Sequence, residues 1–399
     1  MSQGKSRILS QSKAVYVTKT GVLAGAGLAL SGIEANQLER VDSFSWDVDI
    51  AGARQDIRTF GQLARLTSIV NSDLTATCSL GYFLTDGENE HHLGMEINDS
   101  LTGNFIAGVQ GISGYISERP DYKERNIFVA IVAEGLDAHS PDAWVDRTQH
   151  DVLGFGNSFI TDYSVDLAVG ETPRSDVSFE SSNLVFYTGL SSGLYNPSID
   201  PVNGGRIDSG NVALPIASTG NSEVEVLRDG QIQLDLQNST KLGIGGPSLA
   251  SLHPQSVSIS VPLSRDSKKK LGGDLPYSRP LTFPIDVTFA VNALAGGSEA
   301  GEISILSTGC GGQEKRDITV KLFDRCDPSI VRMAYQLKNA VLDNISDGQD
   351  LDGDETVDLT FSAQIGGATT STEGFFMTGS YDTTLGSPLS PTLVSGLVG

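Results

Sequence analysis

The chain has 399 residues and a formal net charge of −22 at pH 7. A chain this acidic is expected to be soluble and to be repelled by nucleic acid and by anionic membranes. This charge excludes the classes of protein that bind nucleic acid or membranes through a large net positive charge. Hydrophobic residues make up 39% of the chain, so it is not a disordered protein. Its 399 residues are enough for two domains that each bury a hydrophobic core.

Short apolar runs alternate with clusters of Ser, Thr, Asn, Asp and Gly, which is typical of an all-β sandwich or barrel. Residues 1–13 are polar and basic and are expected to form an arm. In chain order, the predicted strands span residues 14–18, 28–33, 44–48, 74–84, 127–133, 159–169, 177–186, 224–227, 232–236, 256–261, 283–291 and 318–323. No run is long enough to cross a bilayer, and residues 21–32 are interpreted as part of a first hairpin rather than as a signal peptide.

Three stretches of the second half repeat the apolar alternation of three stretches in the first half, in the same order. The matched pairs are DSFSWDV (42–48) with QSVSISV (255–261), RNIFVAIV (125–132) with RDITVKLF (316–323), and DVSFESSN (176–183) with DLTFSAQI (358–365). Their offsets are 255 − 42 = 213, 316 − 125 = 191 and 358 − 176 = 182 residues. Any β-rich chain yields some such pairs, but three in order, each keeping strand alternation, favour an internal duplication of domain size.

The Pro- and Gly-containing stretch between the two halves is the natural linker. The predicted organisation is a first domain over residues 1–190, a linker over 191–221, a second domain over 222–385 and a flexible tail over 386–399. Within the first domain, residues 88–123 are expected to be irregular. Residues 142–152 are expected to form a short helical excursion.

Residues 329–342 favour an amphipathic helix when they are taken alone. The internal repeat instead places their later half opposite residues 159–169, which alternate as a strand. Laying Tyr335 on Tyr163 gives an offset of 335 − 163 = 172 and predicts a strand over residues 333–341. The following turn would then be longer by 182 − 172 = 10 residues in the second copy.

A search for catalytic or metal-binding residues finds no working constellation. The acidic run over residues 350–358 resembles a calcium loop, but Glu and Phe stand where an EF-hand needs Gly and Glu, so an acidic turn is favoured. The histidines and Cys78 lack the ligand spacing of a zinc site; Cys78 is expected to be a buried free thiol, and Cys310 and Cys326 could pair. No phosphate loop, dinucleotide motif or Gly-x-Ser-x-Gly elbow is complete.

Two matching connections are positively charged in this negative chain. Residues 50–70 and 262–282 together hold eight basic and three acidic side chains. Solvated loops would show the same pattern; the alternative is that basic tips dock on the acidic surface of another copy, because complementary charge steers association. The candidates for that contact are Arg54, Arg58, Arg65, Arg265, Lys268, Lys269, Lys270 and Arg279.

Several stretches of the chain resemble a known family. FITDYSVDLAVGETPRSDVSFESSNL (159–184), preceded by RNIFVAIVAEG and DVLGFGN, and YQLKNAVLDN followed by VDLTFSAQIGG are similar to the tail tube proteins, or major tail proteins, of long-tailed bacteriophages. The tandem duplication is similar to the two-domain subclass of that family. The resemblance covers most of the chain, is one of pattern, and rests on no invariant catalytic motif.

The resemblance implies one β-sandwich per domain, with few helices and with long hairpins that join neighbouring copies into a closed β-barrel ring. A two-domain member would form a trimeric ring with pseudo-sixfold symmetry. Rings would stack into the hollow tail tube of a virion, assembled in the host cytoplasm. The tape measure protein and then genomic DNA would occupy the lumen without specific binding; sheath, baseplate and terminator proteins are further expected partners. The family has no enzyme activity, no cofactor and no membrane role.

A lumen lined by carboxylates would repel phosphate and let DNA slide. Asp47, Asp49 and Asp286, which stand opposite the apolar faces of their predicted strands, are the lumen-facing candidates, and the eight basic side chains named above are the candidates for contacts between rings. Two alternatives stay open. A baseplate hub or tail terminator with the same domain would be present in few copies and would not polymerise alone. A secreted β-rich protein that binds a ligand or calcium would need a signal and would favour disulfides.

Overall fold

The computed structural model is mostly β-sheet, with two short helices among the residues that it describes. These are residues 13–19, 33–49, 54–70, 75–106, 108–117, 124–132, 138, 151–188, 194–199, 211–214, 226–228, 232–237, 252–271, 276, 278–295, 315–348 and 356–381. Most strands belong to a single 15-stranded sheet, and the others form sheets of three and two strands. The fold is therefore all-β, as the short alternating runs of the sequence predict.

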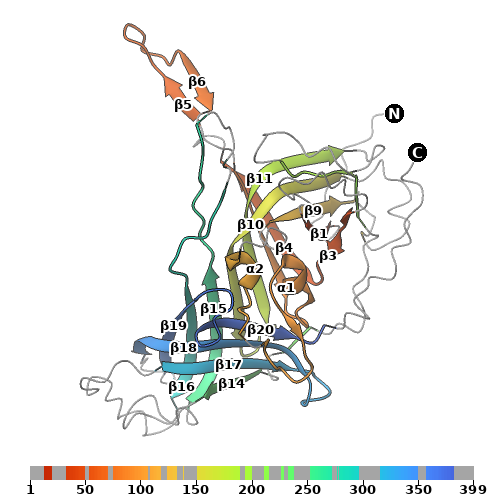
Figure 1. The fold of residues 1–399 in the computed structure, drawn as a ribbon, viewed down its shortest axis with the longest axis vertical. Coiled ribbons are helices and arrows are strands. Elements are labelled where there is room, and N and C mark those ends of the chain that lie inside the picture. The colour runs from red at the N-terminus through yellow and green to blue at the C-terminus, as the bar shows by residue number, and fades with distance from the viewer. Residues whose placement is uncertain are drawn as a thin grey trace.

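Six strands from the first half of the chain lie side by side and form what we name the first repeat (Figure 1). In spatial order they are β1 (Lys13–Lys19), β9 (Arg125–Ile131), β10 (Asp151–Ala168), β11 (Arg174–Thr188), β7 (Ala76–Phe83) and β4 (Val41–Val48). Each is antiparallel to the next. On β11, Val177 and Phe179 are buried while Asp176 and Ser178 are partly exposed, which is the period of two that a half-buried strand requires.

Six strands from the second half form the second repeat in the same arrangement. In spatial order they are β14 (Ile232–Gln237), β17 (Lys315–Phe323), β18 (Val331–Gly348), β19 (Thr356–Gln364), β16 (Asp286–Ala295) and β15 (Leu252–Pro262). The chain visits the six positions in the same order in both repeats. The two halves therefore share one connectivity.

The pairing registers of the two repeats also agree. Ile127 on β9 lies opposite Phe155 on β10. In the second repeat, Ile318 lies opposite Leu337. The offsets are 318 − 127 = 191 and 337 − 155 = 182, so the offset of 191 predicted for β9 and β17 holds in the strand pairing.

Each repeat carries the same irregularity in its longest strand. Asn157 in β10 and Asn339 in β18 have φ angles of 50° and 57°, and 339 − 157 = 182. The backbone N–H of Asn157 donates to Asn126 Oδ1 at 3.2 Å, and that of Asn339 donates to Asp317 Oδ1 at 3.0 Å. Asn adopts this left-handed region more readily than most side chains do. Since connectivity, register and bulge all recur, we infer that the repeats arose by internal duplication.

The pairing corrects the predicted alignment of β10 with β18. Tyr163 and Ile345 lie opposite positions of β11 and β19 that are 182 residues apart, so Tyr163 corresponds to Ile345 and not to Tyr335. The predicted offset of 172 and the longer turn are wrong, because the two tyrosines fall at unrelated positions of their strands. The strand predicted over residues 333–341, against their helical spacing, is confirmed as part of β18.

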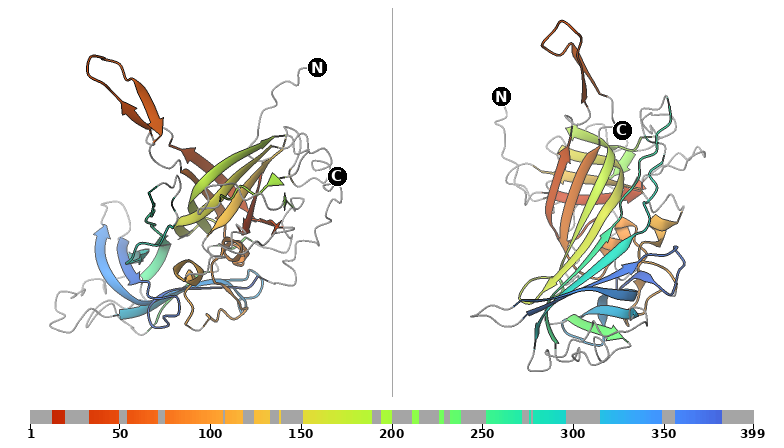
Figure 2. Two further views of the ribbon diagram at one scale, coloured as in Figure 1. Left: turned by 45° about the horizontal axis from the view of Figure 1, so that its top comes forward. Right: turned by 90° about the vertical axis from the view of Figure 1, so that its left-hand side faces the viewer.

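The two repeats join edge to edge through β10 and β15. Residues 162–168 of β10 pair with residues 256–262 of β15, and one hydrophobic core continues beneath both repeats. Figure 2 shows the strands of the first repeat, red to yellow-green, beside those of the second, green to blue. The predicted domain boundaries at residues 190 and 222 stay a prediction, since the shared core marks no division there.

The remaining elements lie around this sheet. They are β2 (Ile33–Glu34), β3 (Asn36–Gln37), β5 (Arg54–Ile57), β6 (Thr67–Val70), α1 (Glu88–Leu93), β8 (Asn98–Asp99), α2 (Ser113–Ile116), β12 (Leu194–Tyr195), β13 (Asn211–Ala213) and β20 (Gly374–Gly379). The segment expected to be irregular contains α1, β8 and α2, and it contacts the second repeat through β8, which pairs with β20. No helix in the described part of the chain is long and apolar enough to span a membrane.

Two predicted connections fall partly outside the described residues or carry unexpected strands. In the described part of the chain β1 pairs with β9 and β3; residues 28–32 of the strand predicted over 28–33 lie outside it, so the predicted first hairpin stays a prediction. The predicted linker contributes β12 and β13, and β13 pairs in parallel with β2. Residues 142–150 of the helical excursion predicted over 142–152, and the tail predicted over 386–399, also lie outside the described residues; residues 151–152 begin β10 instead of ending a helix.

Candidate functional site: a polar face and two open edges

One face of the sheet is polar across seven neighbouring strands, β4, β7, β11, β10, β15, β16 and β19. Side chains directly opposite one another in a sheet point to the same face. Positions that alternate with the buried residues carry mostly hydroxyl, amide and carboxylate groups, and some bond across strands. Ser79 and Ser178 Oγ atoms lie 3.0 Å apart, and Asn292 Nδ2 lies 2.6 Å from Asp358 Oδ1. We name this surface the polar face.

The polar face is strongly acidic. Its acidic members are Asp47, Asp162, Asp166, Asp176, Glu180, Asp286 and Asp358. Arg174 is the one arginine or lysine on this face within the described parts of the seven strands. Burial raises the pKa of Asp162, and burial together with repulsion from Asp176 raises the pKa of Asp166. A surface of this kind repels phosphate groups.

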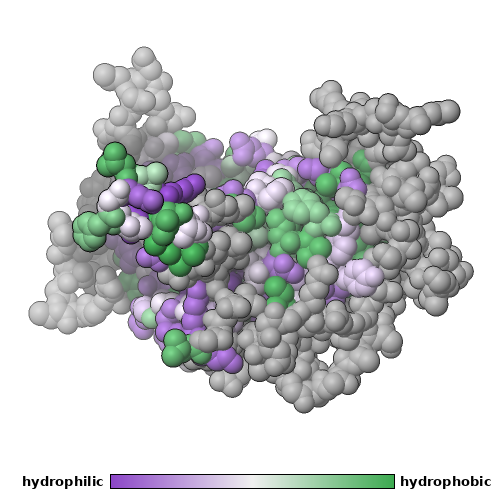
Figure 3. Space-filling view, turned by 90° about the horizontal axis from the view of Figure 1, so that it is seen from above, coloured by the Kyte–Doolittle hydropathy of each residue, from purple (hydrophilic) through white to green (hydrophobic). Residues whose placement is uncertain are grey.

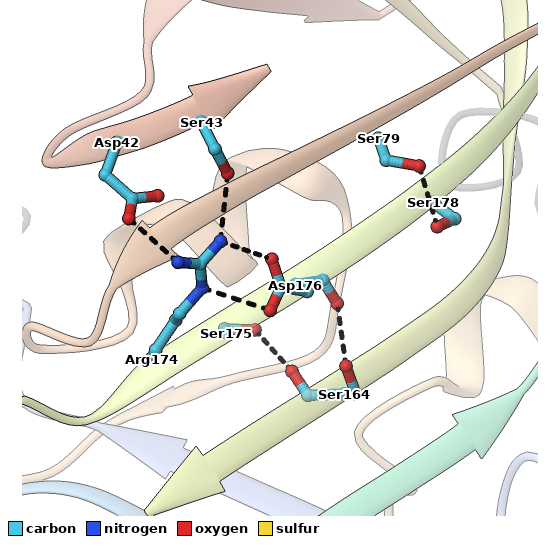
Figure 4. A network of polar contacts seen from close by, with 8 residues as sticks. All are labelled: Asp42, Ser43, Ser79, Ser164, Arg174, Ser175, Asp176 and Ser178. Atoms are coloured by element: carbon cyan, nitrogen blue, oxygen red, sulfur yellow. Dashed lines mark hydrogen bonds and ion pairs between the residues drawn. The ribbon is translucent and has the colours of Figure 1, made fainter. Parts of the chain in front are cut away.

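Arg174 binds two strands of the polar face together (Figure 4). Its Nε and Nη2 donate to the two carboxylate oxygens of Asp176 at 3.1 and 2.9 Å, which raises the pKa of Arg174. The same guanidinium reaches β4, where it lies 2.9 Å from Asp42 Oδ2 and 2.9 Å from Ser43 Oγ. It crosses β7 at Gly81, where a Cβ atom would lie 2.3 Å from Arg174 Nη2, so the crossing requires glycine.

The lumen-facing candidates fall on or beside this face. Asp47 and Asp286 lie on it, opposite the buried side chains of their strands, and Asp49 is exposed just beyond the end of β4. Their place in a lumen stays a prediction. The sequence analysis missed Asp162 and Asp166, although the alternation of TDYSVDL signals both.

Three basic candidates belong to the hairpin formed by β5 and β6. Arg54 begins β5, and Arg58 is exposed in the connection between the strands. Arg65 Nη1 lies 3.2 Å from Asp56 Oδ1 on the same hairpin. One of these charges is therefore already partnered within the hairpin.

The other five basic candidates lie in the second hairpin, residues 263–285, which connects β15 to β16. Lys268, Lys269 and Lys270 are exposed at its outer part, and Lys268 forms an ion pair with Asp266. This exposed group resembles the basic group on hairpin β5–β6. Its docking role stays a prediction.

Arg265 and Arg279 differ from this exposed group. Their guanidinium carbons lie over the ring of Phe159, 4.7 and 5.6 Å from its centre. Arg279 Nη1 lies 2.8 Å from Glu180 Oε1, and burial lowers the pKa of Arg265 to about 10. The sequence analysis treated both as exposed tip residues; instead the second hairpin folds against the first repeat and turns them inward.

Two of the open edges of the sheet are exposed at opposite ends of the polar face, while β14, which pairs only with β17 in the described chain, forms a further edge away from it. β4 pairs with β7 on one side only. β17 covers one side of β18 as far as Val341, whereas β19 and β20 cover the opposite side. On the side of β18 that β17 covers, residues 342–348 therefore have no described neighbour. Unpaired edges attract further strands.

The described residues offer no metal centre. They contain no group of three His, Cys, Asp or Glu side chains placed to hold a metal ion, and residues 349–355 of the acidic turn lie outside them. Cys78 is a free buried thiol whose pKa burial raises to about 12. Cys326 is free and exposed, while Cys310 lies outside the described residues.

No protein-family model matches the chain, and no curated protein matches it significantly. The repeats, the polar face and the open edges are therefore the features that bear on function.

Proposed function

We propose that copies of this chain join head to tail, with β4 of one copy against the open edge of β18 in the next, and close into a ring lined by the polar face. One observation carries the proposal. Within the chain, β10 already pairs with β15 in the way proposed for β18 and β4 of neighbouring copies, because β15 corresponds to β4 and β10 corresponds to β18. A joint between copies would repeat the joint within the chain.

The internal joint predicts the register of the joint between copies. Within the chain, Tyr163 lies opposite Val261. Their counterparts are Ile345 and Val48, since 345 − 163 = 182 and 261 − 48 = 213. We therefore expect Ile345 of one copy to lie opposite Val48 of the next.

Burial differs between the two kinds of edge as the proposal requires. Ile259 of β15 is 1% exposed within the internal joint, whereas its counterpart Trp46 of β4 is 44% exposed. Trp46 packs edge-on against Phe186, with ring centroids 5.9 Å apart. Phe186 is itself exposed, so this edge has apolar surface that a further strand would cover.

A head-to-tail contact produces a ring when the rotation closes, and closure removes every strand edge. Each chain would supply eight consecutive strands, from β4 through β7, β11, β10, β15, β16 and β19 to β18. The resemblance to two-domain tail tube proteins supplies the count of three chains, which gives 3 × 8 = 24 strands. In this proposal the repeats are tandem tube domains, and stacked rings form a hollow tube.

The acidic polar face supports DNA passage as the use of such a tube. Carboxylates repel phosphate, so DNA can move through without adhering. The role is structural, with the tape measure protein and the genome as transient contents. A hub or terminator would close the same ring but would not extend it into tubes.

Two single-sided variants test the ring. Val48→Lys disrupts the β4 edge and Ile345→Lys the β18 edge, so each leaves the other half of the contact intact. Both side chains also pack partly against the core, so folding needs a control. Light scattering of the wild type should give the mass of three chains or of whole stacks of three-chain rings, and each variant alone should be monomeric. A mixture of the two variants should form dimers and nothing larger, because one compatible pair of edges remains.

The mixture also serves as the folding control, since misfolded variants could not form a dimer. Leu101 is exposed and lies outside both edges, so Leu101→Lys should keep the ring mass. Variants that retain wild-type mass would contradict the proposed joint. A monomeric mixture would contradict it as well when both variants unfold in urea as cooperatively as the wild type.

A further inference from the structure

Two arginine side chains of the second hairpin are covered by protein. Figure 3, a view from above, shows hydrophilic residues in purple at the surface, where water can satisfy their hydrogen-bond donors. The side chain of Arg279 is instead only 4% exposed, and burial lowers the pKa of Arg265 to about 10. A buried donor that lacks an acceptor is costly, so the partners of these two guanidinium groups need to be accounted for.

Arg265 has two donors without a partner. Its Nη1 donates to the backbone carbonyl of Arg279 at 3.0 Å, but its Nε and Nη2 are buried and have no hydrogen-bond partner in the described chain. The N–H bonds on this edge of a planar guanidinium run parallel, which matches two oxygens of a single oxyanion. Arg265 therefore presents a pair of donors suited to one bidentate ligand.

Arg174 shows in the same chain what this edge of a guanidinium binds. Nε and Nη2 of Arg174 donate to the two carboxylate oxygens of Asp176 at 3.1 and 2.9 Å (Figure 4). The same two nitrogens of Arg265 are buried, yet no described residue supplies an acceptor for them. Arg265 therefore has the donor pair of an oxyanion site without an oxyanion from the described chain.

Arg279 adds a further donor beside that edge. Arg265 is bridged to Leu281 across the hairpin, so Arg279, two residues from Leu281, extends from the same face. Both guanidinium groups lie over the ring of Phe159. Nε of Arg279 is also buried without a partner among the described residues, while its Nη1 lies 2.8 Å from Glu180 Oε1. Glu180 offsets one of the two positive charges directly.

Glu124 is a further carboxylate near this pair. It favours the charged form of Arg265, but its Oε2 accepts a hydrogen bond from Asn157 Nδ2 at 2.8 Å. Nε and Nη2 of Arg265 gain no acceptor from it. The nearby carboxylates therefore leave the three donors of the two arginines unsatisfied.

The number and burial of these donors define the ligand. A tetrahedral oxyanion such as phosphate or sulfate can accept from both donors of one guanidinium edge and has further oxygens for a third donor, whereas a carboxylate has only two oxygens. The donors are covered, so a free anion can reach them when the hairpin lifts from Phe159, while the backbone of a long nucleic acid is too bulky to follow.

We propose that Arg265 and Arg279 form a binding site for a small tetrahedral oxyanion, of the phosphate or sulfate type, between the second hairpin and the first repeat. A bound anion would satisfy the three donors and hold the hairpin against β10. The N–H of Leu263 donates to the carbonyl of Thr161 at 2.8 Å at the start of this contact. The inference goes beyond the ring and does not depend on it, because the hairpin and the repeat belong to one chain.

Inorganic phosphate is the probe, and the full chain in chloride of equal ionic strength is the reference. Calorimetric titration should show saturable binding of one phosphate per chain, and phosphate should slow hydrogen exchange at the amide of Leu263. Arg265→Lys keeps the positive charge but loses the parallel donors, so phosphate should bind about tenfold more weakly. Lys270→Gln removes an exposed charge from the same hairpin and should leave the affinity unchanged.

Two results would overturn the site. One is phosphate that fails to saturate the wild type or binds equally well to Arg265→Lys. The other is acetate that binds as tightly as phosphate, because the third donor would then have no role. A wild type that binds phosphate but stays monomeric would keep this site and refute the ring.

Urea unfolding in chloride shows whether Arg265→Lys still folds cooperatively. If it does not, Arg279→Lys takes its place, since lysine keeps a charge beside Glu180 but lacks the Nε donor. Weaker phosphate binding by that variant would support the site, and an unchanged affinity would overturn it.

Discussion

A buried carboxyl lies where the two repeats meet. Glu90 of α1 is buried, and its Oε1 accepts hydrogen bonds from Tyr82 at 2.9 Å and from Tyr163 at 3.3 Å. The hydroxyl of Tyr163 in turn lies 3.2 Å from that of Tyr335 in the second repeat. Burial raises the pKa of Glu90 to about 7, because an ionised carboxylate loses its hydration there.

Glu90 should make stability depend on pH. Its pKa is about 7 in the folded chain against an ordinary 4.5, so the folded state binds the proton more tightly. The associated stability is fully present below pH 4.5 and is lost as pH rises through about 7. Relative to Glu90→Gln, which has no charge to bury, the wild type should lose about 3 kcal/mol of unfolding free energy across that window.

Urea unfolding of both proteins between pH 5 and pH 8 measures this difference. Groups that do not interact with Glu90 contribute equally to both curves. Asp86, whose pKa burial also raises, repels the Glu90 carboxylate, so its contribution is part of the difference that is measured. The two curves should therefore diverge as pH rises. Parallel curves would show that Glu90 is already ionised at pH 5 or is solvated in the folded chain.

At the scale of elements, alternation alone predicts most strands. Residues 127–133 are all apolar, with β-branched Ile127, Val129 and Ile131 at alternate positions, and β9 (Arg125–Ile131) covers the first five of them. The apolar residues in the first part of β18 have the spacing of a helix. Only the correspondence with the first repeat predicts a strand there. The positions of Asp47 and Asp286 on one face follow from the same period of two.

What the sequence could not show depends on contacts between distant residues. Arg174 and Gly81 are 174 − 81 = 93 residues apart, and nothing in the sequence around either residue indicates that the two lie close together. The pairing of β10 with β15 is equally hidden, because any exposed strand edge could have been its partner. The inward turn of Arg279 depends on Glu180, which the sequence places in the other half.

Gly81→Ala should loosen edge strand β4. The new Cβ would occupy the space through which Arg174 reaches Asp42 and Ser43, so those bonds should be lost. We expect a loss of about 1–2 kcal/mol of unfolding free energy, as for other substitutions that break a polar network. In an Arg174→Ala background the same change should matter less, and a double-mutant cycle by chemical unfolding measures the coupling. Additive effects would contradict the assigned crossing.

At the scale of the whole molecule, the shared core predicts that the repeats unfold together. Val165 and Ile259 lie opposite each other across the internal joint, and both are buried. Separating the repeats would expose that apolar surface, which opposes unfolding of one repeat alone. Calorimetry of the intact chain should show a single transition, and a fragment that ends at residue 190 should aggregate. Two resolved transitions would mean that the repeats are independent domains.

The joint between β10 and β15 also affects how a ring would form in dilute solution. Bringing separate bodies together costs translational and rotational freedom, and each additional body adds to that cost. Because every chain holds two repeats already joined, a ring of six repeats would need three bodies to meet and not six. The tether keeps those two repeats at an effective concentration that dilution cannot lower. Only the contact between β4 and β18 would then respond to protein concentration, so that contact alone would set the threshold for assembly.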